Sequence, residues 1–164
     1  MADKKITDLT ELTAPAANDY LEIVDTSTNT NKKISRETLA GWYFLSTPLT
    51  STSWDGDSIS TQATGVLIDL STTHGVPARV KAVMVRCYIR DSASATTNGL
   101  YFSLGSGSTG TAQFAVRCSG LPNDYLTDGV GIVPCDANGD IYYRCATSGT
   151  GTMDVWIVIT GYWR

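Results

Sequence analysis

The feature of this sequence that most constrains its fold is a change in composition near residue 45. Residues 46–164 contain no glutamate, one lysine (Lys81) and 14 of the 15 glycines, and they are dense in serine and threonine. Glutamate and lysine favour helices, whereas threonine, valine, isoleucine and aromatic residues favour strands. The composition therefore predicts an all-β body that follows an N-terminal segment of a different kind.

The body shows apolar segments at short spacing, with glycine, proline and asparagine clusters between them. The segments expected to form strands are 65–70, 78–90, 99–104, 112–118, 125–133, 140–145 and 153–163. Seven or eight short strands with such turn signals are typical of antiparallel sandwiches. We therefore expect residues 60–164 to form a β-sandwich or jelly roll with almost no helix.

The first 45 residues are interpreted as an N-terminal attachment arm, joined to the body by a linker over 46–59. The arm is expected to hold a small hairpin, built from 19–26 and 32–35, and a short helix over 36–45 that Ser35 caps. A lone two-stranded hairpin is marginal in water, so the arm needs a surface to dock on: its own body, a sister chain or another protein. Its expected contact residues are Ile6, Leu9, Leu12, Tyr20, Leu21 and Ile23.

The closing strand, 153–163, is apolar on both faces along much of its length. Strict alternation places Met153, Val155, Ile157, Ile159 and Trp163 on one face, and Trp156, Val158 and Tyr162 on the other. One face serves the core. The second face, Trp156 with Val158 and Tyr162, is predicted to lie at a subunit contact, or else under the leader or a long loop of the same chain.

Charge and hydropathy narrow the range of partners. The net charge is −4 and no basic stripe is present, so we expect no binding to nucleic acid. No apolar run approaches the roughly 18 residues of a membrane span, and the N-terminus has no signal-peptide core. We expect a soluble protein that is made in a cytoplasm and has no membrane partner.

The four cysteines, Cys87, Cys118, Cys135 and Cys145, form no C-x-x-C pair, so a zinc site is not expected. Three of them follow an arginine in alternating stretches. This pattern predicts cysteine packed inward as a small hydrophobe and arginine outward. Disulfides are the less favoured alternative, because no signal peptide is present.

Motifs that carry chemistry are few. "DANGD" (136–140) lacks the glycine and distal glutamate of a calcium loop, and Asn138-Gly139 fits a type I′ hairpin turn. "WDGDS" (54–58) has no partner acid, and "GSGSTG" (105–110) lacks the lysine and helix of a phosphate loop. His74 lies in an expected loop without a nucleophile frame. We therefore expect no catalytic residue, no metal, no cofactor and no enzymatic activity.

The leader as a whole, "KITDLTEL…DYLEIVDTSTNTNKKIS", resembles a leader found on many tailed-bacteriophage virion proteins. The likeness covers roughly the first 40 residues, where the I-x-x-L-x-x-L edge, "DYLEIVD" and "KKIS" occur in order. The ending "VWIVITGYWR" is similar to the closing strand of jelly-roll domains in such proteins. Unlike long fibres, this chain has no repetitive shaft between leader and body, which favours a compact knob.

The resemblance implies a structural role on the virion. The leading expectation is a capsid decoration or cement protein, a homotrimer on the capsid surface whose arm binds the major capsid protein or another virion protein. The alternative is a tail-associated appendage or short fibre whose β-domain binds a host-surface glycan. An enzyme such as a polysaccharide depolymerase is the third and least favoured class.

Overall fold

The computed structural model describes residues 20–25, 30–35, 41–95, 99–109 and 112–164 of the chain, which divides into two units, Met1–Ala40 and Gly41–Arg164. In the first unit, β1 (Tyr20–Asp25) and β2 (Thr30–Ser35) pair antiparallel, with Leu21 opposite Ile34. A hairpin therefore stands where the sequence predicts one. Ile6, Leu9 and Leu12 lie outside the described residues.

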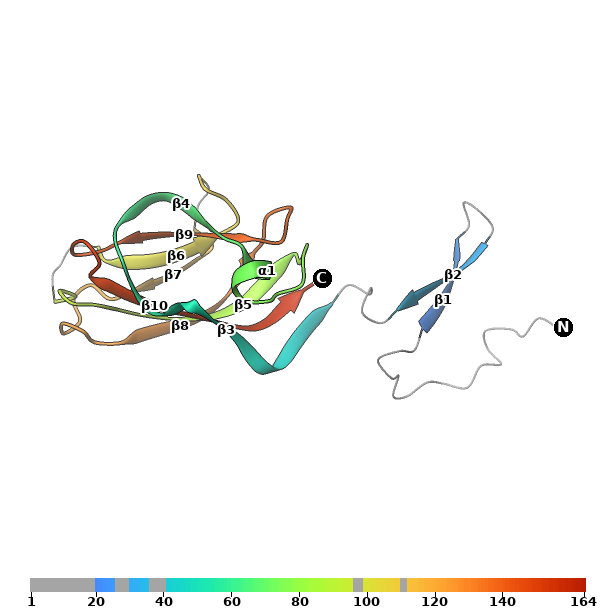
Figure 1. Ribbon diagram of the computed structural model, residues 1–164, viewed down its shortest axis with the longest axis horizontal. Coiled ribbons are helices and arrows are strands. Elements are labelled where there is room, and N and C mark those ends of the chain that lie inside the picture. The colour runs from blue at the N-terminus through green and yellow to red at the C-terminus, as the bar shows by residue number, and fades with distance from the viewer. Residues whose placement is uncertain (1–19, 26–29, 36–40, 96–98, 110–111) are drawn as a thin grey trace. The chain divides into compact units, whose positions relative to one another are not determined.

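The second unit, the body, consists of two four-stranded antiparallel sheets (Figure 1). Sheet I has the order β3 (Trp42–Ile59), β10 (Met153–Trp163), β5 (Ala82–Asp91) and β8 (Thr127–Pro134). Sheet II has the order β4 (Gln62–Ile68), β9 (Ile141–Ala146), β6 (Tyr101–Gly105) and β7 (Phe114–Arg117). Figure 1 shows the two sheets as separate layers.

The strands of the body pair in a nested order. The first strand, β3, pairs with the last, β10; β4 pairs with β9, β5 with β8, and β6 with β7. Two further pairings, β5 with β10 and β6 with β9, join these ladders into the two sheets. In its topology the body is therefore one long antiparallel hairpin that is folded into two sheets.

The two sheets share one core. In β10 every second residue from Met153 to Ile159 is buried, as the alternation of a strand requires. Core residues of sheet I, such as Cys87 and Ile157, belong to the same cluster as Phe102 and Ile141 of sheet II. The prediction of an all-β, antiparallel body with almost no helix is confirmed.

The predictions for residues 36–59 are wrong over the described part. Strand β3 runs from Trp42 to Ile59, so it replaces both the second half of the helix expected over 36–45 and the linker expected over 46–59. Pro48 is tolerated because β3 is an edge strand. Gly56 has φ of +116° and lies at a register shift between β3 and β10, so it is part of a β-bulge.

One short helix interrupts the body. Helix α1 (Leu70–Thr73) lies between β4 and β5, outside the segment 36–45 in which the sequence predicts a helix. Asp69 caps it by accepting a hydrogen bond from the Thr72 amide at 3.0 Å. This hydrogen bond is the main cause of the lowered pKa of Asp69.

The turn at Asn138-Gly139 exists, but its type differs from the prediction. The Gly139 amide donates to the Asp136 carbonyl at 3.1 Å, and Gly139 has a positive φ whereas Asn138 does not. A type I′ turn needs positive φ at both central residues. The flanking strands β8 and β9 belong to different sheets, so this turn carries the chain between layers and does not close a hairpin.

Candidate functional site

The outer face of sheet I, which points away from the core, is the most unusual surface of the described body. Among the described residues, seven large apolar side chains are exposed, and four of them lie on this face. They are Phe44, Val130, Ile132 and Trp163, exposed by 71, 61, 50 and 36%. Scattered apolar residues are normal on a surface, but a gathered set marks a contact.

The strand register places these residues in adjacent rows across the sheet. One row runs Ile132, Met84, Gly161 and Phe44, each directly opposite the next. A second row runs Val130, Arg86, Val158 and Thr50. At the end of the sheet, Trp163 lies between Ala82 and Trp42. Residues opposite each other on paired strands share a face.

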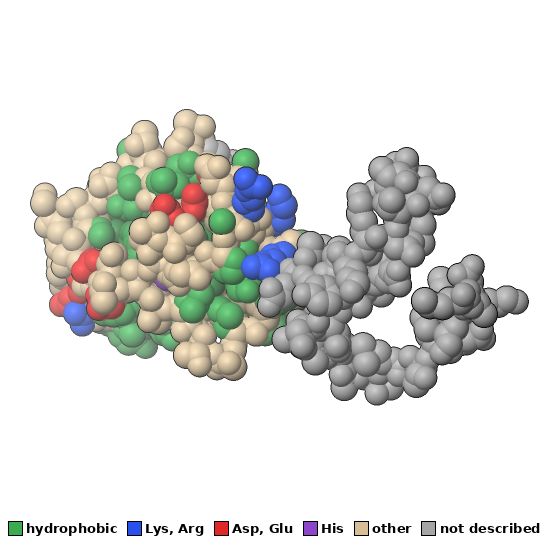
Figure 2. All heavy atoms as spheres, turned by 45° about the vertical axis from the view of Figure 1, so that its right-hand side comes forward, with side chains coloured by type: hydrophobic (Ala, Val, Ile, Leu, Met, Phe, Trp, Pro, Cys, Tyr) green, Lys and Arg blue, Asp and Glu red, His purple; other side chains and the backbone are tan. Residues whose placement is uncertain are grey.

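We define the apolar strip by the large apolar members of these rows: Trp42, Phe44, Met84, Val130, Ile132, Val158 and Trp163. Its aromatic end is in ring contact, since Trp42 stacks on Phe44 with centroids 6.4 Å apart and meets Trp163 edge-on at 5.7 Å. These contacts limit the motion of three large rings. Binding of a partner here would therefore cost little additional side-chain entropy. Figure 2 shows hydrophobic side chains reaching the surface of the body in several places, with few charged groups between them.

The other end of the same face is polar. Arg86 pairs with Asp128 at 3.1 Å, and Arg90 pairs with Asp154 at 2.9 Å. Each arginine also lies near an aromatic ring, Arg86 at 4.8 Å from the centroid of Tyr88. Asp55, opposite Trp156, adds a third carboxylate, so both arginines are paired and one carboxylate is in excess.

The structure places the predicted interface residues in different surroundings. Val158 lies within the apolar strip, half-buried. Trp156 lies on the same face, half-buried between Arg90, whose guanidinium is 5.5 Å from its ring, and the backbone of Gly56. A Cβ on Gly56 would stand 2.7 Å from Trp156 Cζ2, so this glycine makes room for the indole.

The placement of Tyr162 and Trp163 is corrected. A β-bulge between Ile159 and Gly161 inserts one residue into β10 and reverses the alternation after it. Tyr162 consequently packs against the core and stacks on Tyr43 at 5.4 Å, whereas Trp163 turns to the outer face. Sequence alternation alone missed the bulge. The pairs Trp42/Phe44 and Val130/Ile132, each two residues apart, were signals that could have marked the strip.

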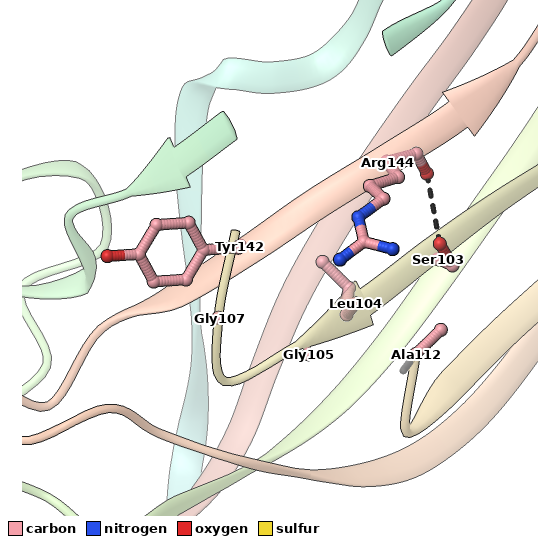
Figure 3. Close-up of a pocket in the computed structure, with 7 residues that line it drawn as sticks. All are labelled: Ser103, Leu104, Gly105, Gly107, Ala112, Tyr142 and Arg144. Atoms are coloured by element: carbon pink, nitrogen blue, oxygen red, sulfur yellow. Dashed lines mark hydrogen bonds between the residues drawn. The ribbon is translucent and has the colours of Figure 1, made fainter. Parts of the chain in front are cut away.

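The outer face of sheet II is covered in part by the chain itself. Ser103 on β6 is buried and donates to the Arg144 carbonyl at 3.2 Å. The connection after β6 folds over this face: Ser108 accepts from the Gly65 amide at 2.8 Å and from Arg144 Nη2 at 3.1 Å. A shallow pocket of about 10 Å³ remains beside Tyr142 and Arg144 (Figure 3). This is room for about one water molecule and not for a larger ligand.

Three aspartates lie near α1, but their carboxylate oxygens accept hydrogen bonds from backbone amides. Asp136 Oδ1 accepts from the amides of Asn138, Gly139 and Asp140, and Asp140 Oδ1 accepts from the Leu70 amide at 3.0 Å. Burial, followed by the nearby carboxylates of Asp69 and Asp136, raises the pKa of Asp140. Within the part of the chain that the structure describes, no three acidic, histidine or cysteine side chains are arranged to hold a metal ion.

The cysteines confirm the prediction that the cysteine of each Arg–Cys step points inward and the arginine points outward. Cys87, Cys118 and Cys145 are buried, while Arg86 and Arg117 are exposed and Arg144 is half-buried. All four cysteines are free thiols. Burial raises the pKa of Cys118 to about 11 and that of Cys135 to about 12, so these thiols stay protonated near neutral pH and are poor nucleophiles.

His74 is buried at the C-cap of α1. Its Nδ1 shares a hydrogen bond of 3.0 Å with Thr73 Oγ1, and its Nε2 has no partner of good geometry. Burial lowers the pKa of His74, and the nearby Ile157 carbonyl offsets this in part. No nucleophilic side chain is hydrogen-bonded to its Nε2, so the ring packs as a neutral structural group.

Comparisons with known proteins do not assign the chain to a family: no family model matches it, and no curated protein matches it. No helix among the described residues has the length and apolar character needed to span a bilayer. Of the predicted arm residues, Tyr20, Leu21 and Ile23 fall on strand β1. The function therefore has to be argued from the geometry of the body and from the leader.

Proposed function

We propose that the protein is a non-enzymatic bacteriophage virion structural protein, a capsid decoration or cement protein. In this proposal the N-terminal unit is the attachment arm, bound to the major capsid protein or another virion protein. The body is a jelly-roll knob on the capsid surface. Three copies form a homotrimer, so that three arms attach together.

The observation that carries the proposal is the division of the chain into a two-stranded N-terminal unit and a self-contained β body. The body has two four-stranded sheets packed on one core, whereas a lone hairpin of two six-residue strands is marginal in water. A marginally stable N-terminal unit joined to a stable body is what we expect of an arm that becomes ordered when it binds its partner. Three arms on one trimer would raise the effective concentration of each and strengthen attachment.

The strand order supports the jelly-roll interpretation. Eight strands in two sheets, with nested pairs from β3–β10 to β6–β7, correspond to the double Greek key that defines a jelly roll. Jelly rolls occur in viral capsid proteins and in lectins. The same strand order therefore also favours the alternative, a tail-associated appendage or short fibre that binds a host-surface glycan.

A binding experiment tests the arm. Full-length protein with Ile6, Leu9 and Leu12 all changed to serine should fail to co-sediment with undecorated particles, while the wild type co-sediments. Leu126→Ser is the matched control, since Leu126 is exposed on the body. Attachment that survives the arm substitutions would contradict the proposal.

Copy number separates the two roles. A cement protein should be present in a fixed, high ratio to the major capsid protein on a gel of purified virions. An appendage should be present in far fewer copies, and this result would favour the glycan-binding alternative.

A further inference from the structure

The apolar strip on sheet I gathers exposed apolar side chains on one face of the body. A fully covered aromatic side chain buries about 150–250 Å², and an aliphatic one somewhat less. At the exposures of Phe44, Val130, Ile132 and Trp163, these four side chains alone expose on the order of 400 Å². Contiguous patches above a few hundred Å² are typical of interfaces.

The charges around the strip bear on which partner fits. Arg86 lies between Val130 and Val158 in the second row of the strip, where it is paired with Asp128. The Arg90–Asp154 pair and Asp55 lie in rows beyond the strip. A surface that meets its own copy meets its own charges, and unpaired like charges there would repel. The one charged side chain within the strip is paired, which limits this repulsion, whereas a partner recognised by charge would need unpaired charges at the contact.

The exposed apolar area of the strip is also consistent with a second copy of this chain as the partner. A standard interface buries about 800 Å² on each partner. The strip supplies roughly half of this from four side chains, and the half-buried Trp42, Met84 and Val158 lie in the adjoining rows. The aromatic rings at its end are the kind of anchor that dominates interface energies.

We propose that the apolar strip is a self-association surface, and that its occupant is the same strip of a second copy of this chain. Copies related by a rotation axis along the strip bury Phe44, Trp163, Val130 and Ile132 against one another. This inference rests on the homo-oligomer in the proposed function, but not on capsid binding. It replaces the predicted centre of the interface, Trp156 and Tyr162, with residues closer to the start of β3.

Self-association through this surface also has a use for attachment. The strip begins at Trp42, directly after Gly41, where the body starts. Copies that meet at the strip therefore bring residue 41 of each chain close to the contact. Tethering the N-terminal units near one point is the arrangement that gives multivalent binding its gain.

The test uses full-length protein and a matched pair of substitutions. Ile132 and Leu67 are both 50% exposed on β strands, Ile132 in the strip and Leu67 on sheet II. Ile132→Lys should weaken self-association by at least tenfold in analytical ultracentrifugation across a micromolar concentration series, because like charges meet at the axis. Leu67→Lys should leave the mass distribution unchanged.

A second pair guards against misfolding. Phe44→Lys, on β3, should dissociate the oligomer like Ile132→Lys, whereas Tyr125→Lys, at a similarly exposed position, should not. Circular dichroism checks that each variant keeps its β signal. The inference is overturned if the wild type is a monomer up to ~100 μM, or if the strip and control variants dissociate equally.

Particle binding distinguishes this inference from the proposed function. An oligomer that depends on the strip but does not co-sediment with particles would leave the inference standing and overturn the capsid role. A monomer that still binds particles would do the reverse. A dimer would keep the strip as the contact and replace the trimer.

Discussion

The two sheets of the body have equivalent inner faces and opposite outer faces. Inside, both contribute fully buried residues to one core. Outside, sheet II is covered by its own connection through Ser108 and carries polar groups such as Ser103 and Arg144. Sheet I presents Phe44, Val130, Ile132 and Trp163 to solvent. The difference shows that exposed apolar side chains gather on the outer face of sheet I, whereas sheet II has a single one, Leu67, on its strands.

The largest expected effect tests whether the inner faces are equivalent. Phe102 on sheet II and Ile157 on sheet I are fully buried. Phe102→Ala should lower the free energy of unfolding by about 3–5 kcal/mol and Ile157→Ala by about 2–5 kcal/mol, since each leaves a cavity. Urea denaturation measures both, with Leu67→Ala as an exposed control. A mild loss in one sheet only would break the picture of a single shared core.

The next prediction removes the cover of sheet II. A Cβ on Gly65 would stand 2.6 Å from the Ser108 Cα, a backbone atom that cannot yield easily. Gly65→Ala should therefore lower the free energy of unfolding by about 1–3 kcal/mol. Gly107→Ala, in the covering connection, meets nothing within 4 Å and should change stability by less than about 0.5 kcal/mol.

Amide exchange adds a local readout to this comparison. In Gly65→Ala, protection of the amide at position 65 should fall, because its hydrogen bond to the Ser108 carbonyl is strained. If Gly65→Ala and Gly107→Ala have equal effects on stability and exchange, the connection is not held on sheet II by this contact.

A pH-dependent effect is expected where the chain passes from sheet II to sheet I. Burial lowers the pKa of His74, so below the unfolded pKa of about 6.5 the unfolded chain binds more protons than the folded one. Stability from this group is complete above about pH 6.5. Below that value it falls by up to ~1.4 kcal/mol for each pH unit, until the folded pKa is reached.

Denaturation of the wild type at pH 7.5, 6.5 and 5.5 measures this loss. His74→Gln carries no titrating ring, so its stability should change less between pH 6.5 and 5.5. An equal decline in both proteins would assign the pH dependence to other groups.

The smallest effects are expected from the ion pairs on the outer face of sheet I. Arg86, Asp128 and Arg90 are each more than two-fifths exposed, and exposed pairs contribute about 0.2–1 kcal/mol. A double-mutant cycle with Arg86→Gln and Asp128→Asn should give a coupling energy in this range, and 1 M salt should reduce it. A coupling well above 1 kcal/mol would mean that this end of the face is not solvated.

Much of the body was predictable from the sequence, because local patterns decide strand existence. The closing strand has the predicted bounds, 153–163, and each of the seven expected segments overlaps a strand. The arginine–cysteine steps gave the correct side for Cys87, Cys118 and Cys145. These signals depend only on alternation between core and solvent.

The remaining features depend on non-local structure. Strand β3 is rich in serine and threonine and contains Pro48 and Gly56, so it was interpreted as a linker; its stability as a strand comes from pairing with β10. The bulge before Gly161 reversed the faces of Tyr162 and Trp163, and no local signal revealed it. The apolar strip is formed by four strands, β3, β10, β5 and β8, that only the sheet register brings together.

The nested strand order has a consequence for how the body is made. Its innermost pair, β6 and β7, is close in sequence, whereas the outermost pair joins Trp42 to Trp163 and depends on the strand that the ribosome produces last. Because β10 lies between β3 and β5, β3 cannot join sheet I before β10 has been made, although β5 can already pair with β8. Folding of the body is thus expected to be slow, as for other folds of high contact order. Until β10 is in place, β3 presents an unpaired edge.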